Sequence, residues 1–178
     1  EMLRSLVGSE MCIRDRGIFN RWGPDFAVEH GLVLACNEGA VMTVGFGHRY
    51  PSVEVWSTSR VDQPWRVDDE GIDAVSDLLH AAHVAVSDDV PANEEWHYRP
   101  MGTGVAVPWG IILKLRISTL AGFEGGTKIY VNTISPAALA AMLLPKLFQA
   151  RAAGRIAPMD LGDECEIPRG VLAATWVR

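Results

Sequence analysis

Three short apolar runs in the first third of the chain are joined by connectors of only a few residues. The runs Leu32–Cys36, Val41–Phe46 and Val53–Trp56 are rich in side chains that favour strands. The connectors, Asn37–Gly39 and Gly47–Pro51, have the composition of turns. Parallel strands need a crossover of about a dozen residues or more, so these connectors favour antiparallel pairing. The sequence therefore predicts an antiparallel sheet.

The residues from Asp69 to Ser87 have the periodicity of a helix. Acidic residues at positions 68–70 stand where the positive end of a helix dipole favours them. A second strand pair is expected at Glu95–Tyr98 and Trp109–Ile117. One face of the helix collects side chains at helical spacing: Ile72, Val75, Leu79, Ala82, His83 and Val86.

A second main helix is expected to begin at Ser135 and Pro136, because serine is a good N-cap and proline suits the first helical position. The helix runs to about Leu144, and Pro145 is expected to kink or split it. It then continues to Gly154, which suits a C-terminal cap. Strands that pair around two main helices place the chain in the α+β class, with an antiparallel sheet.

The composition is that of a globular chain and argues against several classes of protein. Hydrophobic residues make up 48% of the 178 residues and charged residues 21%, which argues against disorder. The net charge of -6 argues against nucleic-acid binding, which needs a basic face. The longest apolar stretches, Val105–Leu113 and Ala137–Leu144, are too short to cross a membrane. Cys12, Cys36 and Cys165 fit neither a disulfide framework nor a zinc motif, which favours a reduced, cytoplasmic compartment.

Residues 1–16 are expected not to belong to the natural protein. They show neither strand alternation nor a helical stripe, and they lack the features of a signal peptide. Glu10 to Arg16 back-translates as GAG-ATG-TGT-ATA-AGA-GAC-AG, which resembles a transposon end used in sequencing-library preparation. The alternative is an ordinary disordered N-terminus. We therefore expect residues 17–178 to form a single α+β domain, and the natural chain to begin upstream of Gly17.

One glycine-rich segment, residues 122–128, is the most informative for binding. It is expected to form a tight turn that leads into a strand over Ile129–Asn132. A phosphate-binding loop of the Walker type is excluded, because that motif requires its lysine to open a helix.

The side chains of this segment suggest contacts with a phosphorylated sugar. Gly125 and Gly126 allow a positive φ or the close approach of a ligand. Glu124 can accept hydrogen bonds from paired sugar hydroxyls, and Lys128 can meet a phosphate. The alternative is a hairpin turn with exposed charges, and the residues alone do not favour either interpretation.

Other polar groups have simpler structural explanations. His97 suits acid–base work, but no partner for it is evident in the sequence. His80 and His83 are three residues apart on the expected helix, yet further zinc ligands at matching spacing are missing, which favours a core or interface histidine. Cys36 in a strand run favours a buried thiol over a nucleophile. The acidic residues within 160–164 favour a solvated loop over a cation site.

Four segments, taken in order, resemble the C-terminal half of galactose-1-phosphate uridylyltransferases, members of the histidine-triad superfamily. Tyr50–Trp56 is similar to the family's Pro-aromatic-Glu strand, and Asn93–Pro100 to its Trp-His segment. Leu120–Glu124 resembles its Leu-Ala-Gly-x-Glu stretch, which a downstream Asn132 and the helix opened by Ser135-Pro136 follow in the same order. The whole also resembles an uncharacterised bacterial family distantly related to these transferases.

This resemblance implies a protein of two similar halves, of which the chain would be the second. The implied reaction moves a nucleoside monophosphate between a nucleotide sugar and a sugar phosphate through a covalent histidine. The glutamate of the Leu-Ala-Gly-x-Glu stretch contacts sugar hydroxyls in that family, often across a homodimer interface. Here that residue is Glu124, with Gly122 and Phe123 beside it.

The chain also departs from the family pattern. The catalytic His-Pro-His belongs to the first half, and the sequence contains no His-x-His. Ser57–Arg60 replaces a basic Pro-Lys-x-His end, and Ile111–Arg116 replaces a His-rich strand. No catalytic residue, metal ligand or cofactor is therefore assigned in this chain, although the resemblance leaves room for zinc in the parent protein.

Two functions remain open. The first is a substrate-binding half of a nucleotidyltransferase, inactive alone, that binds a nucleotide sugar or sugar phosphate. The second is a non-enzymatic dimerisation or ligand-sensing domain, whose interface would use Val105–Trp109 and the tryptophans Trp56, Trp96 and Trp109.

Overall fold

The computed structural model describes residues 18–102, 107–117 and 122–172. The expected non-native segment, residues 1–16, lies outside this part of the chain. Residues 105 and 106 of the suggested interface loop Val105–Trp109, and residues 120 and 121 of the Leu-Ala-Gly-x-Glu stretch, also lie outside it.

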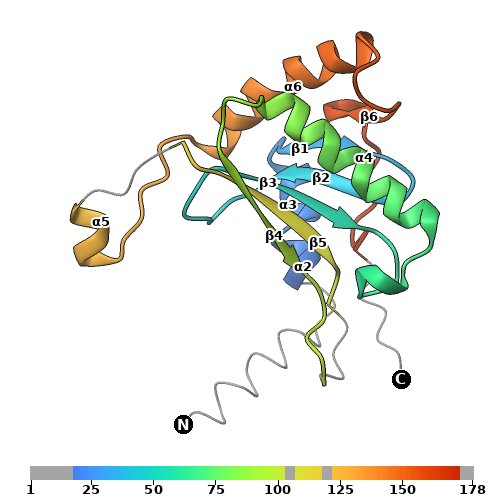
Figure 1. Cartoon of the computed structure of the whole chain (residues 1–178), viewed down its shortest axis with the longest axis horizontal. Coiled ribbons are helices and arrows are strands. Elements are labelled where there is room, and N and C mark those ends of the chain that lie inside the picture. The colour runs from blue at the N-terminus through green and yellow to red at the C-terminus, as the bar shows by residue number, and fades with distance from the viewer. Residues whose placement is uncertain (1–17, 103–106, 118–121, 173–178) are drawn as a thin grey trace.

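The core of the fold is a six-stranded sheet with the strand order β4-β5-β3-β2-β1-β6 (Figure 1). Every neighbouring pair is antiparallel, which confirms the predicted α+β class. The strands are β1 (Val33–Cys36), β2 (Ala40–Val44), β3 (Ser52–Ser57), β4 (Ala92–His97), β5 (Gly110–Leu115) and β6 (Asp160–Leu161).

The first five strands lie where the apolar runs predicted them, within a few residues. β6 was not expected, because two residues leave too little pattern to detect. It pairs with Ala35 and Cys36 at the end of β1. This pairing brings Cys165 beside Cys36, and burial raises the pKa of both free thiols.

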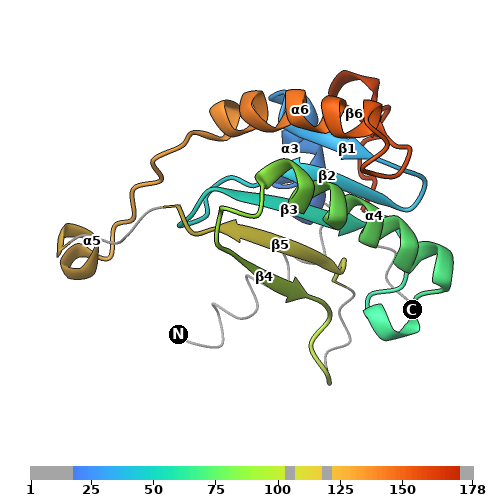
Figure 2. The ribbon, with the colours of Figure 1, turned by 45° about the horizontal axis from the view of Figure 1, so that its top comes forward.

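Two long helices, α4 (Asp69–Val86) and α6 (Pro136–Ala152), lie across one face of the sheet (Figures 1 and 2). They pack against each other, and between them they contact β1, β2 and β3. Short helical segments complete the described elements: α2 (Ile18–Arg21), α3 (Pro24–Glu29), η1 (Pro64–Arg66), α5 (Gly122–Thr127) and η2 (Gly162–Glu164). None of the described helices has the length and apolarity needed to cross a bilayer.

Helix α4 follows the predicted stripe except at His83. The side chain of Asp68 caps the helix by accepting a hydrogen bond from the Gly71 amide at 3.1 Å. The stripe residues Val75, Ala82 and Val86 are buried against the sheet. His83 is exposed, so of the two expectations, a core or an interface histidine, the core position is wrong and the interface position stays a prediction. The Nε2 atom of its ring lies 2.8 Å from the Glu94 carboxylate of β4.

Helix α6 begins and ends as the sequence predicts but is not split. The Ser135 hydroxyl accepts from the Ala138 amide, and Gly154 adopts a φ of 67° just beyond the last turn. Pro145 lies inside one continuous helix, so of the two expected effects, a kink or a split, the split does not occur. Both Pro145 and Ala141, whose carbonyl loses its helical hydrogen bond, are on the exposed side, where water can satisfy that carbonyl.

The predicted strand over Ile129–Asn132 is wrong. Residues 122–127 form the short helix α5, and residues 128–132 have no regular structure. Lys128 ends α5 in the left-handed region with a φ of 61°. Figures 1 and 2 both show α5 well away from the sheet, so residues 129–132 have no neighbouring strand with which to pair. We call residues 122–132 the arm.

An ion pair joins α6 to the C-terminal segment. The Arg151 guanidinium donates to both carboxylate oxygens of Glu164, at 2.5 and 2.9 Å. This bidentate contact, helped by the Leu161 amide, lowers the pKa of Glu164 from 4.5 to about 2. A carboxylate whose pKa is lowered by folding stabilises the folded state at any pH above its ordinary pKa. This stabilisation is lost as the pH falls from the ordinary pKa to the lowered one.

We therefore expect the variant Glu164→Gln to reduce the acid sensitivity of the fold. The wild-type chain should lose stability between pH 4.5 and about pH 2, and the variant should lose less over the same interval. The measurement is the urea midpoint as a function of pH. Asp163→Asn is the control, because this neighbouring exposed carboxylate makes no ion pair within the described residues. Equal acid slopes in wild type and Glu164→Gln would contradict the expectation.

Candidate functional site

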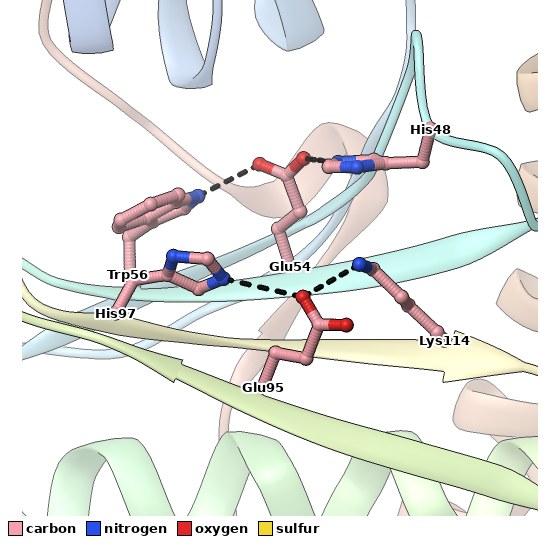
Figure 3. Close-up of polar contacts among 6 residues, drawn as sticks. All are labelled: His48, Glu54, Trp56, Glu95, His97 and Lys114. Atoms are coloured by element: carbon pink, nitrogen blue, oxygen red, sulfur yellow. Dashed lines mark hydrogen bonds and ion pairs between the residues drawn. The ribbon is translucent and has the colours of Figure 1, made fainter.

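The face of the sheet opposite α4 carries a cluster of ionisable side chains. Strand β3 explains why, because its side chains alternate between the two faces. Val53 and Val55 enter the core under the helices, so Glu54 and Trp56 point to the opposite face (Figure 3). We call this the open face, although Phe19 of α2 and Leu172 cover it around Trp56.

Glu54 lies at the centre of the first polar group. Glu54 is only 7% exposed, and its carboxylate accepts a hydrogen bond from Trp56 Nε1 at 2.8 Å. The second carboxylate oxygen lies 2.6 Å from His48 Nε2. Gly45 permits this arrangement, because a Cβ there would come within 2.9 Å of Glu54 Oε1. A buried carboxylate therefore fixes the orientation of the His48 imidazole.

A second polar group lies beside the first, on strands β4 and β5 (Figure 3). The Lys114 ammonium is 2.5 Å from Glu95 Oε2, and His97 Nε2 is 3.7 Å from the same oxygen. The hydrogen bond from Lys114 is the main cause of the lowered pKa of Glu95. Glu54 and Glu95 point to the same face of the sheet, since both lie opposite Ile112 of β5.

The open face can bind a polar ligand but shows no metal site. The imidazoles of His48 and His97 and the Lys114 ammonium can donate to phosphate oxygens, and the carboxylates can accept from hydroxyl groups. Within the described ranges, three or more His, Cys, Asp or Glu side chains nowhere come together to hold a metal ion. Lys114 is a cation in the strand where the resemblance would place metal-binding histidines, so these residues do not fit zinc.

The structure separates the predicted site residues into two places. His97 lies on the open face, where it meets Glu95. Glu124 lies in the arm, and its Oε1 accepts from the Val131 amide at 3.1 Å. The other predicted residues are in the arm too: Gly122, Phe123, Gly125, Gly126, Lys128 and Asn132. Since α5 projects away from the sheet, one chain does not bring His97 and Glu124 together (Figure 1).

The arm glycines are not needed for the fold of this chain. Gly125 and Gly126 do not adopt a positive φ, and a Cβ at either position would meet nothing within 4 Å. In this segment Lys128, and neither of these two glycines, adopts a positive φ. The expectation of a positive φ at these glycines is therefore wrong, and the close approach of a ligand stays a prediction.

Sequence reasoning missed His48, Glu54 and Lys114 as site residues. One signal was present for Glu54, because a carboxylate between two valines in a strand must be buried or face a second polar surface. No local signal existed for the other two. Lys114 pairs with a residue 19 positions earlier, and that proximity arises only from the pairing of β4 with β5.

Solved structures with the same fold include an ADP-glucose phosphorylase and a uridylyltransferase. An ADP-glucose phosphorylase from Arabidopsis thaliana with bound ADP-glucose matches with a TM-score of 0.58 and 20% identity, over 68% of this chain and 46% of that one. A uridylyltransferase mutant matches with a TM-score of 0.62 and 15% identity, over 84% of this chain and 53% of that one. The chain thus spans about half the length of these structures, and the likeness establishes the fold.

Sequence comparison gives a family match. The model of a family described as "Domain of unknown function (DUF4921)" matches residues 7–174. A search of curated protein sequences finds no match.

Proposed function

The chain belongs to the family of the domain of unknown function DUF4921, and from this premise we propose that it is the substrate-binding, C-terminal half of a nucleotidyltransferase resembling galactose-1-phosphate uridylyltransferase. Its ligand would be a nucleotide sugar or a sugar phosphate. The observation that supports this most is the polar open face in a fold shared with a structure that holds ADP-glucose. A phosphorylated sugar offers the anionic oxygens and hydroxyl groups that such a face can bind.

In this proposal the arm supplies the sugar contacts. Glu124 holds sugar hydroxyls and Lys128 approaches a phosphate, with Gly122, Phe123 and Asn132 beside them. The Gly125-Gly126 backbone lets the ligand come close. Because the arm projects away from its own sheet, we infer that it reaches the open face of a second copy in a homodimer (Figure 2). His97 would then hydrogen-bond the ligand from the sheet side.

The variant Glu124→Ala tests this role in the complete parent protein. Loss of one or two hydrogen bonds to a charged group should reduce the use of the sugar phosphate about 10- to 100-fold in kcat/KM. Glu38→Ala is the control, because Glu38 is an exposed glutamate in the β1–β2 turn. An unchanged rate for Glu124→Ala would remove this residue from the site.

The alternative is a non-enzymatic dimerisation or ligand-sensing domain. The exposed apolar side chains of the arm are compatible with such an interface. Of the tryptophans first suggested for the interface, Trp56 and Trp109 are buried and only Trp96 is exposed. A covalent nucleotidyl-histidine trapped on the parent protein would support the transferase, whereas ligand binding without any transfer would support the alternative.

A further inference from the structure

Two arginines lie against one tyrosine ring at the end of the sheet from which the arm departs. The Arg49 guanidinium carbon is 5.3 Å from the centroid of the Tyr50 ring, and that of Arg116 is 5.0 Å from the same centroid. Arg49 also lies 4.1 Å from the ring centroid of Tyr130 in the arm. Three segments that are distant in sequence therefore meet here: the β2–β3 loop, the residue after β5, and the arm.

The stacking leaves the hydrogen-bonding groups of both arginines available. A guanidinium packs on a ring through its flat face, whereas its five N–H donors point outward in the plane. Both arginines are exposed, and neither has a carboxylate within ion-pair distance in the described part of the chain. The rings therefore hold two positive charges near each other without a neutralising partner, and an anion would relieve their repulsion.

This pair is continuous with the open face. The Arg116 amide donates to the Pro91 carbonyl at 2.7 Å, which extends the β4–β5 pairing by one residue. Side chains alternate along an extended strand, so Arg116 lies on the same face as Lys114. Arg49 directly follows His48, the imidazole oriented by Glu54. Lys114 and His48 thus lie near this end of the open face, each paired with a carboxylate, whereas Arg116 and Arg49 beside them have no such partner among the described residues.

We propose that Arg49 and Arg116 form a binding site for the phosphate or diphosphate group of the ligand. This inference rests on the proposed function and deepens it, because it assigns the phosphate contacts to residues outside the predicted motif. Planar N–H pairs match phosphate oxygens bidentately, which a lysine cannot do. Because Arg49 also packs on Tyr130, the same anion would fix the base of the arm.

The test compares two double variants of the 178-residue chain. Arg49→Ala with Arg116→Ala removes the proposed site, whereas Arg60→Ala with Arg155→Ala removes the same charge from two exposed arginines elsewhere on the surface. Calorimetric titration uses inorganic pyrophosphate and ADP-glucose as separate probes. We expect the first double variant to bind both probes at least about 100-fold more weakly than wild type, and the control to bind them as wild type does.

A third variant separates charge from geometry. Arg49→Lys with Arg116→Lys keeps both positive charges but loses the planar donors and the stacking. We expect it to bind about 10-fold more weakly than wild type, between the other two proteins. Thermal unfolding of each variant shows whether it is folded, and the lysine pair supplies the test if the alanine pair is not.

The outcomes distinguish this inference from the proposed function. If wild type binds ADP-glucose and loss of Arg49 and Arg116 has the same effect as the control, the inference is wrong and the function stands. If pyrophosphate binds through the two arginines but ADP-glucose binds no better than pyrophosphate, the anion site stands and the nucleotide-sugar function is wrong. If wild type binds neither probe, the anion site is wrong.

Discussion

The substitution Leu147→Ala is expected to lower the free energy of unfolding by about 2–5 kcal/mol. Leu147 is fully buried in α6, within the core that α6, α4 and the sheet share. Removing its side chain loses apolar burial and leaves a cavity, because the helix is held by its neighbours on both sides and cannot collapse fully into the space. Urea unfolding followed by circular dichroism measures the change.

Met142→Ala on the same helix provides the matched control. Met142 is 52% exposed, so its truncation should change the stability by about 0.5 kcal/mol or less. Both substitutions replace a large apolar side chain of α6 by alanine. The two side chains differ mainly in how far they are buried. Similar losses for the two variants would mean that α6 does not pack on the sheet as the structure shows.

The elements that the sequence predicts correctly are those with local signals. The cap of α4 at Asp68 and the cap of α6 at Ser135 each depend on one side chain and an amide three residues later. Gly154 ends α6 for a similarly local reason, because the chain needs a left-handed residue there. The length of the connectors between the apolar runs is also a local signal, and it is sufficient to indicate antiparallel pairing.

The failures all concern interactions that depend on the rest of the molecule. Ile129 and Val131 have strand-forming side chains, yet a strand needs a partner, and these residues are 61% and 58% exposed away from the sheet. Pro145 does not split α6, one of the two effects expected of it, because its position on the solvent side reduces the cost of the lost hydrogen bond. His83 follows the apolar periodicity, yet it is exposed, and its ring meets Glu94 of the neighbouring strand.

The candidate site was predictable only in part for the same reason. His97 was selected from its chemistry, and the structure places it on the open face beside Glu95. The polar side chains that surround it on this face come from another strand, as Lys114 does, or from a loop, as His48 does. Their approach follows from strand order and register, which the apolar pattern alone does not specify.

The substitution Glu54→Ala is expected to have the largest effect of any change on the open face. It leaves the buried indole N–H of Trp56 without its acceptor and releases the His48 ring. An unsatisfied buried donor together with the lost charge-assisted contact should lower the free energy of unfolding by about 2–4 kcal/mol. If the open face binds the ligand as proposed, affinity for ADP-glucose should also fall, because His48 is no longer held in one orientation.

Glu95→Ala is the matched control, since it removes a carboxylate from the same face at an exposed position. Its side chain is 45% exposed, so losing the pair with Lys114 should cost about 0–1 kcal/mol. Glu54→Gln keeps an acceptor for the Trp56 indole and should recover part of the stability while leaving His48 without a charged partner. Equal losses for Glu54→Ala and Glu95→Ala would show that Glu54 does not organise the site. A gradation from Ala through Gln to wild type at position 54 would show that the buried carboxylate both supports the sheet and positions the imidazole.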